Sequence, residues 1–328
     1  MNKNVIIIGG GIVGCLSALE FKKKGFDVTI IEKSKIGQES SSAAAGILYP
    51  LMPWNYNEKF YELSLGASKF YEELSKKFLK DFDQDIEFIC SGLILLPPYD
   101  EDKILEWSER SKTNILKKDK SILIPEVSQL NTKKLMSFLK DYLLSLDIKI
   151  CENLSVIKIK TEKNLVDSVY TTNNKKFNGD IFVLAAGAWS SIIHDKLRKK
   201  IKPIRGQIIE YSAGDFVIEN IIFSNGTYIL QRKNRSIIAG STLEDVGFSD
   251  QNLAEPITDL DYRAKKILNY LKKCKIEKTW YGFRPAVDDN YPIISKDENY
   301  ENMYIHSGHF RYGITMALAT TKILMSHF

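Results

Sequence analysis

Three glycines near the start of the chain have the spacing of a binding site for the phosphates of a dinucleotide. Gly9, Gly11 and Gly14 form the pattern G-x-G-x-x-G directly after the apolar residues 5–8. The first glycine permits a tight turn, the second lets a pyrophosphate approach the backbone, and the third lets a helix pack closely on a strand. The helix that follows would point its free N–H groups and its positive dipole end at the phosphates.

A carboxylate ends the next apolar run, where a dinucleotide fold places its ribose ligand. Glu32 follows residues 28–31, so strand, glycine loop, helix, strand and acidic residue follow one another within about 30 residues. The carboxylate would bind ribose hydroxyls and repel a 2′-phosphate. The combination predicts a dinucleotide site, whereas a glycine triplet alone would be weak evidence. NAD and FAD share this unit, so other residues must separate them.

A small, hydroxyl-rich segment follows the acidic residue. Residues 40–46 read SSSAAAG. Small side chains would let a cofactor lie against the backbone, and the serines could hold phosphate or ribityl oxygens. A flexible loop is the alternative interpretation of the same residues.

The composition excludes several classes of function. The chain has 328 residues, 44% hydrophobic and 27% charged, which is typical of a soluble globular protein. The net charge of +5 is spread out, and runs such as residues 198–200 are short, so we expect no nucleic-acid partner. The four cysteines form no CxxC pair, so no metal site is expected. No apolar stretch is long enough for a signal peptide or a membrane span, which predicts a cytoplasmic protein.

The chain alternates between two kinds of pattern. Buried strands with helices are expected at both ends and in the middle, and alternating strands are expected between residues 207 and 241. A long helix is expected over residues 58–80, and another over residues 259–273. The prediction is an α/β fold (α+β overall), with a Rossmann-type domain interleaved with a second domain on a mixed or antiparallel sheet.

Five segments in order resemble the FAD-dependent family of glycine oxidase and D-amino-acid oxidase, most strongly the bacterial glycine oxidases of thiamine biosynthesis. They read ESSSAAAGIL (39–48), FVLAAGAWS (182–190), PIRGQ (203–207), WYGFRP (280–285, followed by Asp289 and Pro292) and GHFRYGI (308–314). The resemblance implies non-covalent FAD, an FAD-binding domain of residues 1–84, 137–206 and 282–328, and a substrate domain of residues 85–136 and 207–281. It assigns the cofactor to Gly9, Gly11, Ile12, Val13, Gly14, Glu32, Lys33, Ser40, Ser41, Ser42, Ala44, Ala45, Gly46, Ala185, Ala186, Gly187, Gly308, His309, Phe310, Arg311, Tyr312, Gly313 and Ile314.

The resemblance also implies which residues meet the substrate. Arg284 and Arg311 would clamp a substrate carboxylate, because a guanidinium offers a planar fork that matches it. Tyr228 matches a tyrosine that reaches the substrate, and Ile47 matches a methionine of the pocket. Structural ion pairs are the alternative for the arginines, and simple core packing is the alternative for Tyr228 and Ile47.

The implied reaction is hydride transfer from the Cα of a small amino acid or amine to flavin N5, giving an imine that hydrolyses. Either O2, reduced to H2O2, or a quinone or protein carrier would take the electrons. A tRNA-modifying flavoprotein would need a basic surface or a fused methyltransferase domain, for which this chain has no room. A non-catalytic FAD-binding scaffold is a further alternative. Family members often form homo-oligomers. Two departures from the family, Tyr312 in place of asparagine and a short C-terminus, leave the preferred substrate open.

Overall fold

The computed structural model describes residues 2–212, 214–249 and 254–328. The chain divides into two compact units. The first contains Met1–Ala44, Thr132–Ile204 and Phe283–Phe328, and the second contains Ala45–Asn131 and Arg205–Gly282. The predicted interleaved α/β fold is confirmed.

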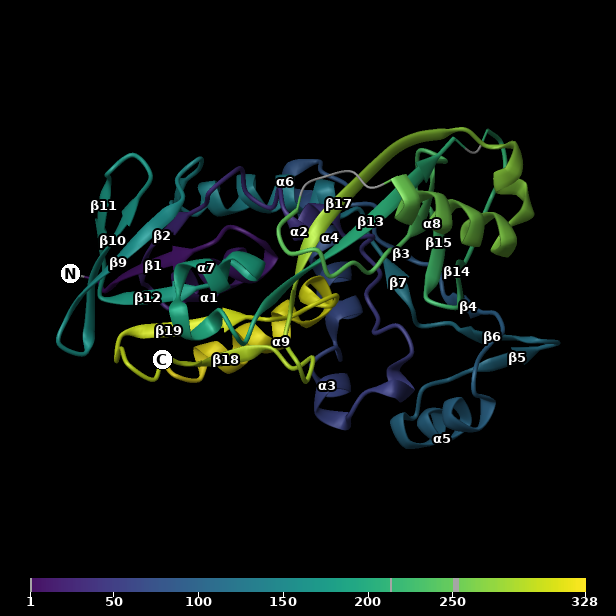
Figure 1. The fold of residues 1–328 in the computed structure, drawn as a ribbon, viewed down its shortest axis with the longest axis horizontal. Helices are drawn as coiled ribbons and strands as arrows, with labels where there is room; N and C mark the ends of the chain where they lie inside the picture. Colours follow the sequence, from purple (N-terminus) through teal and green to yellow (C-terminus); the bar gives the residue numbers. More distant parts are fainter. Residues whose placement is uncertain (1, 213, 250–253) are drawn as a thin grey trace. The chain divides into compact units, whose positions relative to one another are not determined.

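The first unit is built on a mostly parallel sheet in the order β18-β19-β12-β1-β2-β8 (Figure 1). The antiparallel strand β18 pairs with β19 at one edge. Its elements are β1 (Asn4–Ile8), α1 (Ile12–Lys23), β2 (Asp27–Ile31), α2 (Ser40–Ala43), α6 (Thr132–Ser145), β8 (Lys149–Cys151), β9 (Val156–Glu162), β10 (Leu165–Thr171), β11 (Lys176–Asn178), β12 (Ile181–Leu184), α7 (Ser190–Ile193), β18 (Ile293–Lys296), β19 (Met303–Ser307) and α9 (Gly313–Met325).

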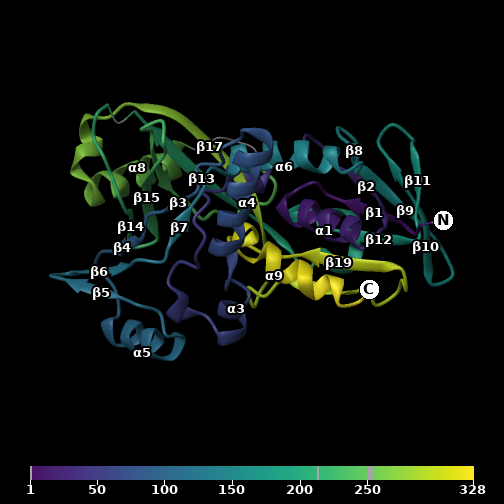
Figure 2. The ribbon, with the colours of Figure 1, turned by 180° about the vertical axis from the view of Figure 1, so that it is seen from behind.

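Both faces of this sheet are covered, which explains why its central strands are continuously apolar. Residues 5–8 of β1 are at most 2% exposed. The helices α1 and α9 lie side by side on one face (Figure 2). On the other face, side chains of β1, β12 and β19 pack with the antiparallel sheet β11-β10-β9. The glycine loop of residues 9–11 follows the carboxyl end of β1, and Glu32 follows the carboxyl end of the neighbouring strand β2.

The second unit is built on a mixed sheet in the order β17-β13-β16-β15-β14-β4-β6-β5. Its elements are α3 (Glu58–Glu62), α4 (Ala67–Phe82), β3 (Ile89–Cys90), β4 (Leu93–Leu95), α5 (Glu101–Ser111), β5 (Leu116–Lys118), β6 (Ser121–Ile124), β7 (Ser128–Gln129), β13 (Lys202–Tyr211), β14 (Ile221–Ser224), β15 (Thr227–Gln231), β16 (Ile237–Gly240), α8 (Ala254–Ile267) and β17 (Ile276–Ala286). Strands β13 and β17 extend past the unit boundaries. One face of the sheet packs on α8, and the other packs on aromatic residues of the segments 45–61 and 99–107.

Two expected helices differ from those observed. The helix expected over residues 58–80 is interrupted between α3 and α4, where Gly66 has a left-handed φ of 77°. The helix expected over residues 259–273 begins earlier, at Ala254, and ends at Ile267, where a 3-10 turn over Asn269–Lys273 follows. Glycine can adopt the left-handed conformation at little cost, so it separates two helices whose apolar spacing reads as one.

Residues 45–84 pack with the second unit, although the sequence grouped them with the cofactor domain. Tyr49, Trp54 and Tyr61 each place an aromatic ring within 6.3 Å of the Trp107 ring, centroid to centroid. This aromatic cluster joins the segment after residue 44 to helix α5.

Candidate functional site

The glycine loop between β1 and α1 is shaped by backbone contacts that exclude side chains. Gly9 has a φ of 110°, and a Cβ there would collide with the carbonyl oxygen of Ala185. A Cβ at Gly14 would collide with the carbonyl oxygen of Gly9, so this glycine lets α1 pack on its own loop. Gly11 differs from both, because a Cβ there would meet only the Ser41 hydroxyl, at 3.2 Å. The protein therefore does not fill the space in front of Gly11.

The first turn of α1 offers a positive end to that space. It contains no acidic side chain, and its N-cap, Gly11, provides no side-chain hydrogen bond. The N–H of Ile12 donates to Ser41 Oγ at 3.0 Å. Helix N-termini with unpaired N–H groups attract phosphates, so this turn can hold a pyrophosphate.

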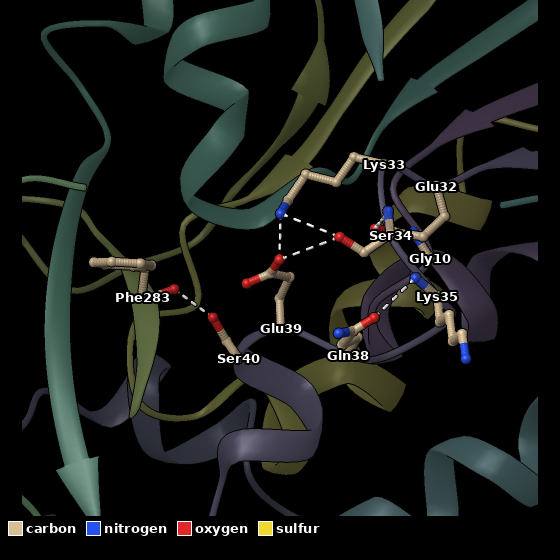
Figure 3. A network of polar contacts seen from close by, with 9 residues as sticks. All are labelled: Gly10, Glu32, Lys33, Ser34, Lys35, Gln38, Glu39, Ser40 and Phe283. Atoms are coloured by element: carbon tan, nitrogen blue, oxygen red, sulfur yellow. Dashed lines mark hydrogen bonds and ion pairs between the residues drawn. The ribbon is translucent and has the colours of Figure 1, made fainter. Parts of the chain in front are cut away.

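Glu32 lies at the carboxyl end of β2 and is tied to the glycine loop (Figure 3). Its Oε2 accepts the Gly10 N–H at 2.7 Å, and its Oε1 accepts the Ser34 N–H at 2.9 Å. Burial raises the pKa of this carboxyl, while the two N–H donors act in the opposite direction. Each carboxylate oxygen keeps a further lone pair, so both can still accept from ribose hydroxyls.

Lys33 and the residues up to Ser40 form a polar network beside this carboxylate (Figure 3). The Lys33 ammonium pairs with Glu39 and lies 4.0 Å from the centroid of the Trp189 ring. The Ser40 hydroxyl donates to the carbonyl of Phe283. These contacts tie the segment 33–40 to β17 and to the turn that follows β12.

The expected serine- and alanine-rich segment is only partly a loop. Residues 40–43 form the short helix α2, and the carbonyls of Ser42 and Ala44 accept the Thr132 hydroxyl at 3.2 and 2.7 Å. Ala45 and Gly46 belong to the second unit. Of the predicted cofactor residues here, Ser41 is the one that contacts the start of α1.

The segment after β12 forms one wall of the glycine loop. The Ala185 N–H donates to the Ile8 carbonyl at 2.8 Å, which extends the parallel pairing by one residue. Ala186 then leads into a 3-10 turn at Gly187, whose φ is 54°. The Ala185 carbonyl is the group that excludes a side chain at Gly9.

The segment 308–314 makes a tight turn into α9. Gly308 and Phe310 have φ values of 89° and 49°, and the Phe310 N–H donates to the Pro285 carbonyl at 2.9 Å. Helix α9 begins at Gly313, followed by the buried Ile314. The N-cap residue Tyr312 is 4% exposed, so its side chain is part of the core. The turn brings a second helix N-terminus into the first unit.

His309 is buried in the core and is hydrogen-bonded to helix α9. Its Nε2 lies 3.0 Å from the Thr320 hydroxyl, which itself donates to the Met316 carbonyl, so the ring nitrogen must be the donor. Burial lowers the pKa of His309 to about 3. Burial also lowers the pKa of the neighbouring His306, whose Nδ1 lies 3.0 Å from the Ser17 hydroxyl. Both rings are therefore neutral at physiological pH.

The arginines expected to bind substrate both lie in the first unit. Arg284 is half-buried on β17, and Arg311 is half-buried in the turn before α9. The Nε of Arg311 is buried and has no hydrogen-bond partner among the described residues. Its Cζ lies 5.2 Å from the centroid of the Phe310 ring. A buried guanidinium N–H without a partner is costly, which points to a ligand that would accept from it.

The other two expected substrate residues lie in the second unit. Tyr228 is 7% exposed on β15. Ile47 forms an isolated bridge with Gln129, beside the hydrogen bond from the Leu130 N–H to the Gly46 carbonyl. Both side chains belong to the same apolar face of the sheet.

Sequence reasoning missed the contacts of two arginines of the second unit, of which Arg205 is buried and Arg232 is half-buried. Arg205 is fully buried and pairs with Glu244 through Nη2 at 2.6 Å. Arg232 donates to the carbonyls of Ala45 and Leu130 at 2.7 and 2.8 Å. The PIRGQ motif drew attention to Arg205, but its partner lies 39 residues away, and no local pattern marks such a pair.

The described residues contain neither a cluster suited to a metal ion nor a helix suited to span a membrane. No cluster of three or more His, Cys, Asp or Glu side chains suited to a metal ion occurs among them. None of their helices is long and apolar enough to cross a membrane.

The geometry of the glycine loop, helix α1 and Glu32 suits a dinucleotide. The space in front of Gly11 is one that a Cβ would occupy, the first turn of α1 is electropositive, and Glu32 has acceptor capacity to spare. The N–H groups at the start of α1 can therefore donate to a pyrophosphate, and the Glu32 carboxylate can accept from a ribose.

Known proteins resemble this chain over nearly its whole length. The sequence profile of the family described as "DAO: FAD dependent oxidoreductase" matches residues 4–326. The glycine oxidase of Pseudomonas putida is 28% identical over 98% of this chain and 93% of its own length. The glycine oxidase of Pseudomonas aeruginosa is 27% identical over 99% of this chain and 94% of its own. The crystal structure of glycine oxidase from Bacillus cereus covers 99% of this chain and 94% of its own, with a TM-score of 0.89 at 23% identity, and thus shares its fold.

Proposed function

Since the chain belongs to the DAO family of FAD-dependent oxidoreductases, we propose that it oxidises glycine, sarcosine or a small D-amino acid. The proposal rests mainly on the buried Nε of Arg311, in the turn before α9, which has no hydrogen-bond partner within residues 2–212, 214–249 and 254–328. Full-length relatives named glycine oxidase support the choice of substrates. The products would be a keto acid, which is glyoxylate from glycine, and ammonia or the corresponding amine.

When bound, FAD supplies the hydride acceptor, and the protein supplies binding and orientation. The loop of Gly9–Gly14 with the first turn of α1 would hold the pyrophosphate, and Glu32 would hold the ribose. The N–H groups at the start of α9 would donate to the N1–C2=O edge of the flavin. We propose that no covalent link forms, so acid precipitation should release all of the yellow colour from the protein.

The substrate carboxylate is assigned to Arg284 and Arg311. A guanidinium presents parallel N–H donors that match both oxygens of a carboxylate, and such charge-assisted pairs are strong. The Tyr228 hydroxyl is assigned to a further hydrogen bond with the substrate, and Ile47 is assigned to the apolar wall of the pocket. Orientation of the Cα–H bond is the main task of these residues.

No side chain is assigned as a base. The histidine of the α9 turn, His309, is neutral and uses its Nε2–H to bind Thr320. The substrate would therefore react with its amine already deprotonated, and the imine product would be hydrolysed by water. The rate should accordingly rise with pH as the fraction of neutral amine rises.

The electron acceptor is proposed to be O2, which gives H2O2. An oxygen electrode and a peroxide assay with glycine, sarcosine and D-alanine test this directly. Oxygen uptake with equal peroxide formation supports an oxidase. Flavin reduction without peroxide, but with turnover on a quinone or dye, would instead identify a dehydrogenase.

Conservative arginine variants test the assigned substrate site. Arg311→Lys and Arg284→Lys should each lower kcat/KM by about tenfold or more, because lysine keeps the charge but loses the fork. Arg198→Lys is the control, since Arg198 is exposed and pairs only locally with Asp195. Unchanged kcat/KM in both arginine variants, with normal flavin content, would overturn the assignment.

A further inference from the structure

A row of side chains crosses the sheet of the second unit at the level of Tyr228. Strand pairing places Gly240 of β16 between Tyr228 of β15 and Ile208 of β13. On the other side of Tyr228, the row continues through Phe223 of β14 to Leu95 of β4. All these residues except Gly240 contribute a buried side chain to the same apolar face.

The phenol of Tyr228 occupies the place where a side chain of Gly240 would stand. A Cβ built on Gly240 would lie 2.8 Å from Cε2 of Tyr228 and closer still to its Cζ and hydroxyl oxygen. The ring therefore leans from β15 across β16, with its hydroxyl end nearest to Gly240. Since Tyr228 is only 7% exposed, its neighbours hold it in this position.

Gly240 is the last residue of β16, its φ lies outside the left-handed region, and the Gly240–Ser241 peptide bond that follows it is cis. The preceding residues of the same strand, Ile238 and Ala239, are buried and carry side chains. What a larger residue at position 240 would disturb is the Tyr228 ring.

We propose that Gly240 is a positioning residue that fixes the Tyr228 hydroxyl for recognition of the substrate. This inference rests on the proposed function, in which Tyr228 binds the substrate. A methyl group at position 240 would push the phenol off β16 and move the hydroxyl away from its place in the site.

The test is a cycle of variants of the full-length, FAD-loaded protein. Gly240→Ala should raise the KM for the best of glycine, sarcosine and D-alanine about tenfold, the loss expected for one hydrogen bond to a charged group. Tyr228→Ala should raise KM at least as much. In the Tyr228→Ala background, Gly240→Ala should have no further effect on KM, because the ring that it displaces is gone.

A matched control lies next to Gly240 on the same strand. Ala239 faces the opposite side of the sheet, toward α8, so Ala239→Gly changes β16 by one methyl group without reaching Tyr228. It should lower the melting temperature but leave KM unchanged. If Gly240→Ala folds poorly, the double variant Tyr228→Ala/Gly240→Ala should recover the melting temperature of Tyr228→Ala.

The outcomes separate the inference from the function on which it rests. If Tyr228→Ala raises KM but Gly240→Ala does not, the positioning role is wrong. The same holds if Gly240→Ala raises KM equally with and without the tyrosine ring. If Tyr228→Ala itself leaves KM unchanged, the assignment of Tyr228 to the substrate fails, and the positioning role fails with it.

Discussion

A single methyl group at Gly11 should weaken FAD binding strongly without damaging the fold. Gly11 has φ of −73° and ψ of 178°, a conformation that alanine adopts freely. The added Cβ would meet only the Ser41 hydroxyl, at 3.2 Å, and a shift of a few tenths of an ångström would relieve this contact. The methyl group would instead occupy the space that the pyrophosphate needs beside the first turn of α1.

The expected magnitude follows from the hydrogen bonds that the phosphates would lose. Each hydrogen bond between a backbone N–H and a charged group contributes about 1.5–3 kcal/mol. Loss of one such bond lowers FAD affinity about 10- to 150-fold. Loss of two bonds lowers the affinity by the two factors multiplied together. The free energy of unfolding of the apoprotein should change by less than about 0.5 kcal/mol, as for a substitution that makes no new collision.

Two other glycines serve as controls with opposite expectations. Gly14→Ala should lower both stability and FAD affinity, because its Cβ would collide with the backbone of Gly9 and force α1 away from the loop. Gly25→Ala should lower stability alone. Gly25 has a left-handed φ of 84° and open space around its Cβ, so alanine there is strained by about 1–2 kcal/mol but touches nothing.

The assay is a titration of each apoprotein with FAD, followed by flavin fluorescence, together with urea unfolding of the same samples. The predicted pattern is loss of affinity alone for Gly11→Ala and loss of stability alone for Gly25→Ala. Normal FAD affinity in a folded Gly11→Ala variant would show that the space in front of Gly11 is not the pyrophosphate site.

Two further predictions concern buried groups. Burial lowers the pKa of His309 to about 3. As the pH falls, this histidine is therefore protonated in the unfolded chain at a higher pH than in the folded chain. Below about pH 6.5, His309 should lower the free energy of unfolding by about 1.4 kcal/mol for each pH unit. In the His309→Gln variant, whose side chain can still donate to Thr320, the free energy of unfolding measured with urea should fall less between pH 7 and pH 5 than in the wild type. An equal fall in both proteins would contradict a buried, neutral His309 ring. Arg232→Met should lower the free energy of unfolding by about 3 kcal/mol, because it leaves two buried carbonyls unpaired. Substitution of the exposed neighbouring residue, Lys233→Met, should change the free energy of unfolding by less than about 1 kcal/mol. Equal effects of the two substitutions would show that the Arg232 contacts contribute little.

The sequence was sufficient where the relevant contacts are local. The run 5–8, the glycine triplet and Glu32 lie within one βαβ unit, so their spacing alone predicts a buried parallel strand and a dinucleotide loop. The structure has Glu32 at the end of β2, bonded to the Gly10 N–H as that unit requires. The chain's membership of an FAD-dependent family then confirms the choice of FAD over NAD, which the local pattern left open.

Contacts between distant segments could not be predicted in this way. The place of Gly240 beside Tyr228 depends on the register of β15 and β16, and a shift of one residue would turn the tyrosine to the other face of the sheet. The packing of residues 45–84 with Trp107 depends on aromatic contacts that no periodicity reveals. The hydrogen bond between His309 and Thr320 likewise depends on how the turn before α9 folds against that helix.

Anaerobic reduction of the flavin tests most directly whether this chain is an FAD-dependent enzyme that oxidises a small amino acid. The purified, FAD-containing protein is mixed without oxygen with glycine, sarcosine or D-alanine, and the flavin absorbance is followed. At least one of these substrates should bleach the flavin, and admitting air should restore the colour. A protein whose flavin is bleached by dithionite but by none of the three would contradict this prediction.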